Sequence, residues 1–136
     1  IMAIIYHPDR GSILICDFRG FYPPEMTKRR PVIVISPEMK TRPSLCTVVA
    51  LSITPPSVIT PYHCKLIINP PLPYPYSSPF QWVKGDMVYS ISFQRLDFIR
   101  VGKGKNGKRI YDIRVLSNAD METVQRCVLS AMGIHI

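Results

Sequence analysis

A basic triplet, KRR at residues 28–30, leads directly into a short apolar segment. The segment VIVI at 32–35 consists of four consecutive β-branched residues, a pattern typical of a strand buried on both faces. It lies between two prolines and is too short for a helix. The sequence therefore predicts a cation held rigidly at the start of a central strand. A cation in that position can stabilise negative charge that develops during a reaction.

The residue types elsewhere exclude several enzyme classes. The chain has no Walker loop, no G-x-S-x-G motif and no H-E-x-x-H motif. No carboxylate cluster suits magnesium, and the cysteines and histidines lack zinc-ligand spacing, so we expect no metal and no cofactor. Cleavage of RNA without a metal stays possible, because RNA carries its own nucleophile, the 2′-hydroxyl. Such an enzyme needs a base, an acid and a cation near the phosphate.

The chain is strongly basic, with 17 Lys and Arg residues against 9 Asp and Glu residues, a net charge of +8 and a pI near 9.6. This charge favours a polyanionic partner, either nucleic acid or an acidic protein. The 136 residues suit one domain, 1–136. No apolar run approaches the ~18 residues of a membrane span, and no signal segment is evident. We therefore expect a cytoplasmic protein without membrane contact, whose four cysteines are reduced.

Short apolar segments separated by proline, glycine and polar turns predict a succession of strands. The expected strands cover residues 11–18, 31–36, 45–52, 62–69, 81–83, 87–93, 98–101 and 109–115. The Pro- and Tyr-rich stretch at 70–79 predicts a rigid, extended surface loop, a role favoured over that of a ligand for a proline-binding module. The segment GKGKNGK at 102–108 contains an Asn-Gly pair typical of a hairpin turn.

One segment near the C-terminus has the periodicity of a helix. Ser117 and Asp120 have the spacing of a capping box at its start, and Gly133 suits its end. Apolar residues at helical spacing predict a face turned to the core or to a partner subunit. They are Met121, Val124, Val128 and Met132. Many short strands followed by one terminal helix predict a mainly β fold, a small and strongly bent β-barrel with the helix packed on it.

Several segments, taken in order, resemble the PemK/MazF family of toxins from type II toxin–antitoxin systems. The opening segments are GSI and DF within 11–18, and PEM-x-KRRPVIVIS at 24–36. The segment VVALS at 48–52 is similar to the family's next strand, which ends in Ser or Thr. The segment WVKGDMVYSIS at 82–92 is similar to a later strand, and the terminal helix completes the order. The resemblance covers residues 11–133, and it depends on the ordered set rather than on any one motif.

The resemblance implies a homodimeric, sequence-specific endoribonuclease, an mRNA interferase, on a CcdB/PemK-type barrel that needs no metal. A cognate antitoxin is expected to occupy the RNA groove, and the charge of +8 predicts that this antitoxin is acidic. By position, Arg30 matches the catalytic arginine and Ser52 the catalytic hydroxyl, with Thr54 as a rival for that position. Asp86 and Glu25 are the candidate bases for the 2′-hydroxyl proton.

The expected roles follow from side-chain chemistry. Arg30 offers a planar fork to the scissile phosphate, and it is expected to stabilise charge rather than to release a proton. Lys84 stands where the family often has an arginine that acts as acid. Lysine carries the same charge as that arginine but lacks the planar fork of a guanidinium. Basic, polar and aromatic residues are expected to contact the rest of the RNA. They are Lys28, Arg29, Thr54, Lys84, Lys103, Lys105, Lys108, Phe21 and Tyr22.

Two other functions fit the same features. A CcdB-like toxin would bind DNA gyrase without catalysis, and a plain barrel would bind nucleic acid without cutting it. The set of Arg30, Ser52 and Asp86 favours the ribonuclease, because a gyrase-binding protein does not need it. The simplest non-catalytic explanation of Arg30 is a surface ion pair with Glu25. The sequence does not determine the cleavage motif, because base specificity depends on loop conformations, chiefly at 19–29 and 53–61.

Overall fold

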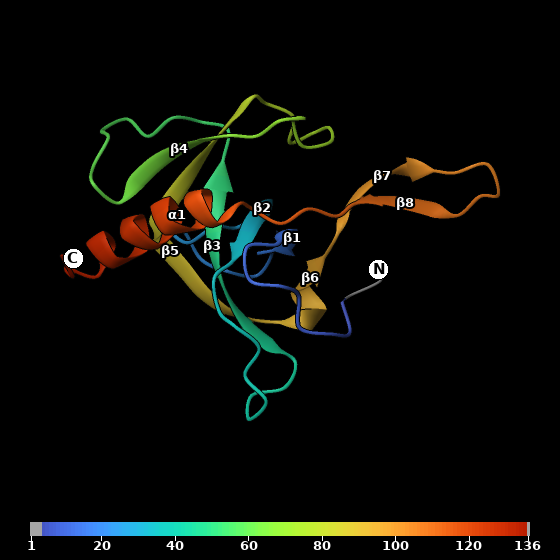
Figure 1. Cartoon of the computed structure of the whole chain (residues 1–136), viewed down its shortest axis with the longest axis horizontal. Helices are drawn as coiled ribbons and strands as arrows, with labels where there is room; N and C mark the ends of the chain where they lie inside the picture. The colour runs from blue at the N-terminus through green and yellow to red at the C-terminus, as the bar shows by residue number, and fades with distance from the viewer. Residues whose placement is uncertain (1–3, 136) are drawn as a thin grey trace.

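The structure of the chain is a computed structural model that describes residues 4–135. This part of the chain is mainly β, with one α-helix near its C-terminus (Figure 1). The strands are β1 (Ile13–Asp17), β2 (Arg29–Val34), β3 (Leu45–Ser52), β4 (His63–Ile67), β5 (Phe80–Ser92), β6 (Leu96–Asp97), β7 (Ile99–Lys103) and β8 (Arg109–Asp112). The helices are the 3-10 turn η1 (Phe93–Arg95) and α1 (Asn118–Ala131). The predicted mainly β chain with a terminal helix is confirmed.

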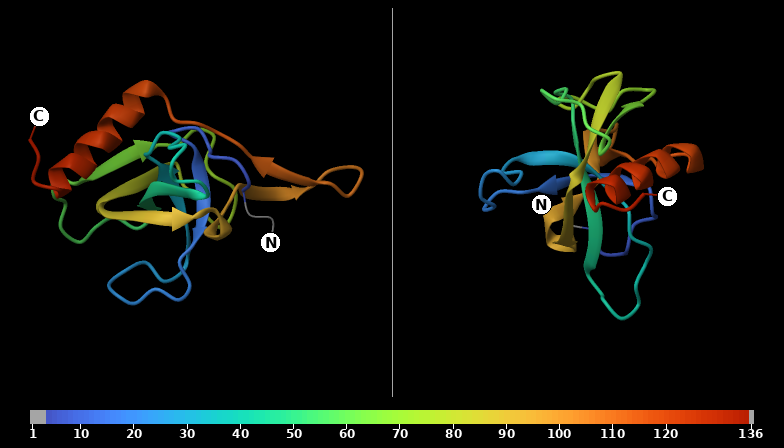
Figure 2. Two further views of the ribbon diagram at one scale, coloured as in Figure 1. Left: turned by 90° about the horizontal axis from the view of Figure 1, so that it is seen from below. Right: turned by 90° about the vertical axis from the view of Figure 1, so that its left-hand side faces the viewer.

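Six strands form one antiparallel sheet in the order β4-β5-β3-β2-β1-β6. Its edge strands, β4 and β6, do not pair with each other, so the described strands form an open sheet and not a hydrogen-bonded barrel. Strand β6 pairs with β1 through only two residues. The chain then leaves the sheet as the two-stranded β7–β8 hairpin, which projects away from the body of the molecule (Figures 1 and 2).

Both faces of the sheet are buried at its centre, as the apolar run at 32–35 predicts. On one face, Ile33, Val49 and Val83 pack with the buried side of α1. On the other face, Val32 and Val48 pack with apolar residues that include those of the loop between β1 and β2. Strand β2 begins two residues before its expected start at 31, because residues 29 and 30 pair with residues 17 and 16 of β1. The basic triplet therefore belongs partly to the strand itself.

Strand β5 is continuous over thirteen residues, whereas the sequence predicts two strands interrupted near Gly85. A register shift against β3 absorbs the residues between Lys84 and Val88, so pairing resumes beyond it. At Gly85 the backbone N–H donates to the carbonyl of Tyr62 at 2.9 Å. A Cβ added to Gly85 would lie 2.5 Å from that carbonyl oxygen and 2.7 Å from the carbonyl oxygen of Cys127 in α1. Glycine therefore lets α1 approach the sheet closely.

Helix α1 follows the sequence prediction closely. The Ser117 hydroxyl accepts a hydrogen bond from the backbone N–H of Asp120 at 3.2 Å, and Gly133 ends the helix with a φ of 77°. The apolar face is buried except for Met132, which is 66% exposed and does not reach the core. All four cysteines are free thiols in the structure. Within residues 4–135, no helix has both the length and the hydropathy needed to cross a membrane.

We predict that Gly85→Ala lowers the free energy of unfolding by about 1–3 kcal/mol, because the new methyl group meets two backbone carbonyls that cannot move independently. The matched control is Gly102→Ala in β7, where an added Cβ meets nothing within 4 Å. The control is expected to change stability by about 0.5 kcal/mol or less. Denaturant unfolding at one protein concentration measures both. Equal stability of the two variants would contradict the close approach of α1 to β5.

Candidate active site

Arg30 and Ser52 are brought together by the pairing of β2 with β3. Val32 pairs with Ala50, and the same antiparallel register, extended by two residues, sets Arg30 opposite Ser52. Both residues line one pocket of about 200 Å³ at the ends of these strands. Arg30 is half-buried at the start of β2, and Ser52 is buried at the end of β3. The two predicted residues, 22 positions apart in the chain, therefore share one site.

Two buried polar atoms at this pocket have no hydrogen-bond partner within the described residues. They are Nε of Arg30, a donor, and Oε1 of Gln81, an acceptor. The Gln81 amide is oriented by its Nε2, which donates to the carbonyl of Tyr76 at 2.9 Å. An unpaired buried polar group costs about 1–3 kcal/mol. Arg30 Nε needs an acceptor and Gln81 Oε1 needs a donor, which groups entering the pocket could supply.

Gln81 is a residue that the sequence analysis missed. It is completely buried and lies on β5 between the exposed Phe80 and the half-buried Trp82. A polar side chain at an inward-facing position of an alternating strand is the signal that would have identified it.

The structure distinguishes Ser52 from Thr54, the other candidate for the catalytic hydroxyl. The Ser52 hydroxyl oxygen accepts a hydrogen bond from the backbone N–H of Thr54 at 3.1 Å, which leaves the hydroxyl proton free to donate. Thr54 is exposed and does not line the pocket that contains Arg30. The position at the end of β3 favours Ser52 as the hydroxyl that faces Arg30.

Lys84 and Asp86 of β5 and His63 of β4 form a second group of titratable side chains on the neighbouring strands. Lys84 pairs with Ala50 on one side and with His63 of β4 on the other. Burial lowers the pKa of Lys84, and the charge of Asp86 opposes that shift. Burial and the charge of Lys84 lower the pKa of His63, with Asp86 again opposing. A lysine with a lowered pKa releases its proton more readily than an exposed one.

His63 was not among the predicted site residues. Its Nδ1 accepts a hydrogen bond from the backbone N–H of Thr60 at 3.2 Å, so in the neutral ring Nε2 carries the proton. The adjacent His63-Cys64 pair gave no usable signal in the sequence, because the relevant neighbour, Lys84, comes from another strand.

Glu25 lies in the loop between β1 and β2 and is exposed. Its Oε1 accepts from the backbone N–H of Tyr22 at 3.0 Å, and its own N–H donates to the Tyr22 carbonyl at 2.8 Å. The N–H of Met26 donates to the Tyr89 hydroxyl at 3.2 Å, which ties this loop to β5. Burial raises the pKa of Tyr89, and the charges of Glu25 and Asp86 raise it further. Neither candidate base, Glu25 or Asp86, lines the Arg30 pocket.

Arg30 is not neutralised by Glu25. Within residues 4–135, the ion pairs closer than 4 Å are Arg19–Asp17 and Arg114–Asp112. The non-catalytic explanation of Arg30 as one half of a surface ion pair thus has no support in the geometry. No group of three or more His, Cys, Asp or Glu side chains suited to a metal occurs in the same part of the chain.

The two aromatic candidates differ in their surroundings. Phe21 is half-buried and packs edge-on against Phe18 and Tyr89, with ring centroids 5.6 and 5.7 Å apart. The Arg95 guanidinium covers it at 4.8 Å from the ring centroid. Tyr22 is 80% exposed, so its ring is the one that is open to a base.

The predicted basic residues do not form one cluster. Lys28 is exposed just before β2, and Arg29 lines a different pocket from Arg30. Lys103 lies in β7, while Lys105 and Lys108 lie at the tip of the projecting hairpin (Figure 1). The structure therefore brings Arg30, Ser52 and Lys84 to neighbouring strands and places the hairpin lysines apart from them.

The fold is shared with solved toxins of low sequence identity. A mycobacterial endoribonuclease in complex with its cognate antitoxin is 17% identical, with a TM-score of 0.62 over 96% of this chain and 99% of its own. The toxin MazF-mt6 of Mycobacterium tuberculosis is 15% identical, with a TM-score of 0.57 over 91% and 98%. MazF of Deinococcus radiodurans is 16% identical, with a TM-score of 0.58 over 95% and 99%.

No curated protein sequence matches the chain. A family model does match it, over residues 9–132, and describes the PemK-like, MazF-like toxins of type II toxin–antitoxin systems. This match spans β1 to the end of α1 and contains Arg30, Ser52 and Lys84. The chain belongs to the PemK-like, MazF-like toxin family of type II toxin–antitoxin systems.

Proposed function

We propose that the protein is an endoribonuclease that cleaves single-stranded RNA, including mRNA, by attack of the 2′-hydroxyl on the adjacent phosphorus. The observation that carries this proposal is the pairing of a half-buried, un-neutralised Arg30 with the Ser52 hydroxyl at one pocket. An anionic group entering that pocket would supply the acceptor that Arg30 Nε lacks. The structural similarity to the mycobacterial endoribonuclease that was solved with its cognate antitoxin, together with the family match, supports this activity.

Arg30 and Ser52 would act on the phosphate. The guanidinium donates to the non-bridging oxygens, where charge grows as the 2′-oxygen bonds to phosphorus. The free Ser52 proton donates to the same phosphate or to the ribose, and so positions it. The 2′-oxygen bonds to phosphorus and the bond to the 5′-oxygen breaks, which yields a 2′,3′-cyclic phosphate and a 5′-hydroxyl.

Two protons must move in this reaction. We assign the base that accepts the 2′-hydroxyl proton to Glu25, an exposed carboxylate in the loop that leads into Arg30, and leave to Asp86 the electrostatic effect on Lys84. Lys84, whose pKa burial lowers, would donate a proton to the leaving 5′-oxygen. Asp86 would keep that lysine protonated and would position it. No metal or cofactor takes part in this scheme.

The biological setting follows from the family. The whole chain would form one toxin domain, on a bent sheet of the CcdB/PemK type, and would act in the cytoplasm as a homodimer. An acidic antitoxin would neutralise it, since the chain carries a net charge of +8. The similar structures of a mycobacterial endoribonuclease with its cognate antitoxin and of MazE with MazF from Deinococcus radiodurans support such a partner. The exposed apolar side chains Ile53, Val58 and Ile59, in the loop that follows Ser52, suit a surface covered by a second chain.

We predict that Arg30→Ala lowers cleavage of a long RNA roughly 10²–10³-fold, because it removes a donor to the charge that grows on phosphorus. The control Arg126→Ala removes the same charge from the exposed side of α1 and should leave cleavage unchanged. The assay measures discrete fragments by gel in the presence of EDTA, with circular dichroism to verify folding. A folded Arg30→Ala protein with full activity would remove the main residue of the proposal.

A second pair of variants tests the catalytic hydroxyl. Ser52→Ala removes the hydroxyl that faces Arg30, so we expect a loss of cleavage of roughly tenfold or more. Thr54→Ala changes an exposed side chain outside the pocket and should cost much less. Single-turnover rates with one defined RNA measure both variants, and a larger loss for Thr54→Ala would reverse the assignment.

The proposed acid predicts the pH profile. Lys84 must be protonated to donate, so the rate should fall as pH rises through its pKa, which lies below the ordinary lysine value. Asp86→Asn removes the charge that raises this pKa, so the alkaline limb should move to lower pH. Single-turnover rates, corrected for uncatalysed hydrolysis of RNA, measure the profile. An alkaline limb that Asp86→Asn does not move would contradict the role of Lys84, and a Glu25→Gln variant with a normal rate would contradict that of Glu25.

A further inference from the structure

A second pocket, of about 320 Å³, lies between the β7–β8 hairpin and the loop at 70–79, apart from the pocket of Arg30 and Ser52. Three arginines, three tyrosines and one carboxylate supply its polar lining. They are Arg29, Arg100, Arg109, Tyr74, Tyr76, Tyr111 and Asp97. Its volume is at the lower end of the ~300–1,000 Å³ of small-ligand sites, so it holds one nucleotide-sized group and not several.

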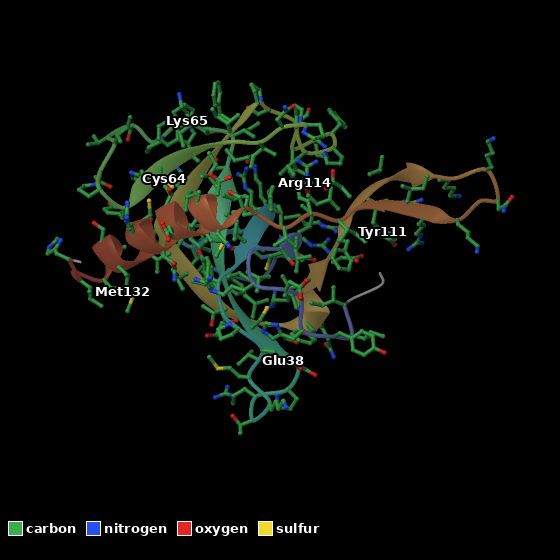
Figure 3. The ribbon with its side chains drawn as sticks, viewed as in Figure 1. Glu38, Cys64, Lys65, Tyr111, Arg114 and Met132 are labelled. Carbon is green, nitrogen blue, oxygen red and sulfur yellow. The ribbon has the colours of Figure 1, made fainter. Side chains whose placement is uncertain are left out.

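The two basic positions of β7 share one face because of a β-bulge. Arg100 pairs with Tyr111 and Lys103 pairs with Arg109, with a register shift between Arg100 and Gly102. Residues 100 and 103 of a regular strand would point to opposite faces. The shift therefore gathers Arg100, Lys103, Arg109 and Tyr111 on one side of the hairpin. Figure 3 shows Tyr111 near the base of the hairpin.

The opposite wall is held in place by buried contacts. Leu72 is buried in the core, and the Tyr76 carbonyl accepts from the buried amide of Gln81 at 2.9 Å. Arg114 joins the two walls: its guanidinium pairs with Asp112 of β8 at 2.6 Å and also donates to the carbonyl of Pro70. The wall at 70–79 is thus held in place, so it loses little conformational entropy when a ligand enters.

The charged side chains that line the pocket are available to bind a ligand. The ion pairs found within residues 4–135 involve none of the three arginines, and Asp97 accepts only from the N–H of Phe98, through Oδ1 at 2.8 Å. Burial raises the pKa of Asp97, while the charges of Arg29 and Arg109 oppose that shift, so both cations lie within electrostatic reach of the carboxylate. Tyr74 is 87% exposed, and its ring lies open at the pocket.

We propose that this pocket binds one guanine nucleotide of the RNA strand, with its phosphate on the arginines, its base against the tyrosine rings and its Watson–Crick edge on Asp97. The inference rests on the proposed function, since it gives the cleaved strand a second contact outside the catalytic pocket. The pocket would recognise the identity of one base in the RNA.

The chemistry of the lining selects guanine among the four bases. A carboxylate accepts two hydrogen bonds side by side, and only guanine offers two adjacent donors, N1–H and the N2 amino group, on its Watson–Crick edge. The O6 and N7 acceptors of guanine fit an arginine fork. Uracil offers a single N–H and two carbonyl oxygens, which would oppose the carboxylate. The tyrosine rings stack any base, so they add affinity without selection.

Calorimetric titration of the full chain tests the pocket without cleavage. The probes are 5′-GMP, 5′-IMP, 5′-UMP, guanosine and inorganic phosphate. We expect 5′-GMP to bind about tenfold or more tightly than 5′-UMP, because one good bidentate pair to a base discriminates by that amount. 5′-IMP, which lacks only the N2 amino group, should be intermediate, and guanosine and phosphate should each bind more weakly than 5′-GMP. Equal binding of 5′-GMP, 5′-UMP and phosphate would overturn the proposal and leave a plain basic patch.

Variants assign the binding to this pocket. Arg100→Gln with Arg109→Gln should weaken 5′-GMP about tenfold or more. The control, Lys40→Gln with Arg42→Gln, removes the same charge from exposed positions before β3 and should leave the affinity unchanged. Asp97→Asn replaces an acceptor by an amide that can also donate, so preference should move from 5′-GMP toward 5′-XMP, whose position 2 is a carbonyl. Unchanged 5′-GMP binding in both pocket variants would overturn the assignment.

The same variants separate this inference from the proposed function. If 5′-GMP binds as expected and no RNA is cut, the pocket stands and the ribonuclease fails. If RNA is cut at the same positions and rates by wild type, by Asp97→Asn and by the double arginine variant, the ribonuclease stands and the pocket is overturned. Loss of selection for guanine beside the cut site in Asp97→Asn, with cleavage of other sites retained, would support both.

Discussion

The antiparallel pairing of β2 between β1 and β3 is the constraint on which the site depends. It sets Arg30 opposite Ser52. Through β3 it also places Lys84 of β5 opposite Ala50, two residues before Ser52. Because all three strands are buried at their centres, the positions of these polar ends are set by packing and not by flexible loops. A shift of one residue in the pairing register of β2 would turn Arg30 to the other face of the sheet. An adjacent residue would then lie opposite Ser52.

The same pairing separates two adjacent arginines. Successive residues of a strand point to opposite faces, so Arg30 lines the pocket with Ser52 while Arg29 lines the pocket at the hairpin. One dipeptide thereby contributes to the lining of two pockets. The charge concentrated in the triplet at 28–30 is divided by the strand geometry, and this division explains why the basic residues predicted to bind RNA do not gather in one cluster.

Local pattern predicted much of the fold, because it reflects local physics. The β-branched run at 32–35 identified a doubly buried strand, and Ser117 identified the start of α1. The continuity of β5 through Gly85 and the open sheet depend on contacts with distant segments, which a local pattern does not contain. For the site, the family resemblance singled out Arg30 and Ser52. His63 was missed because it matters only through Lys84 on another strand. Gln81 was missed although its polar side chain at an inward-facing position of an alternating strand was a usable signal.

The hairpin has a further consequence for how such a molecule can change over time. It leaves the sheet after a two-residue strand, stands away from the core and is held at its base chiefly by the buried Ile99 and by Arg114. Segments with few buried contacts open and vary without cost to the rest of a fold. Insertions and substitutions there would therefore be nearly neutral for folding and for the machinery at Arg30. A lineage can diversify this appendage while the sheet stays constant.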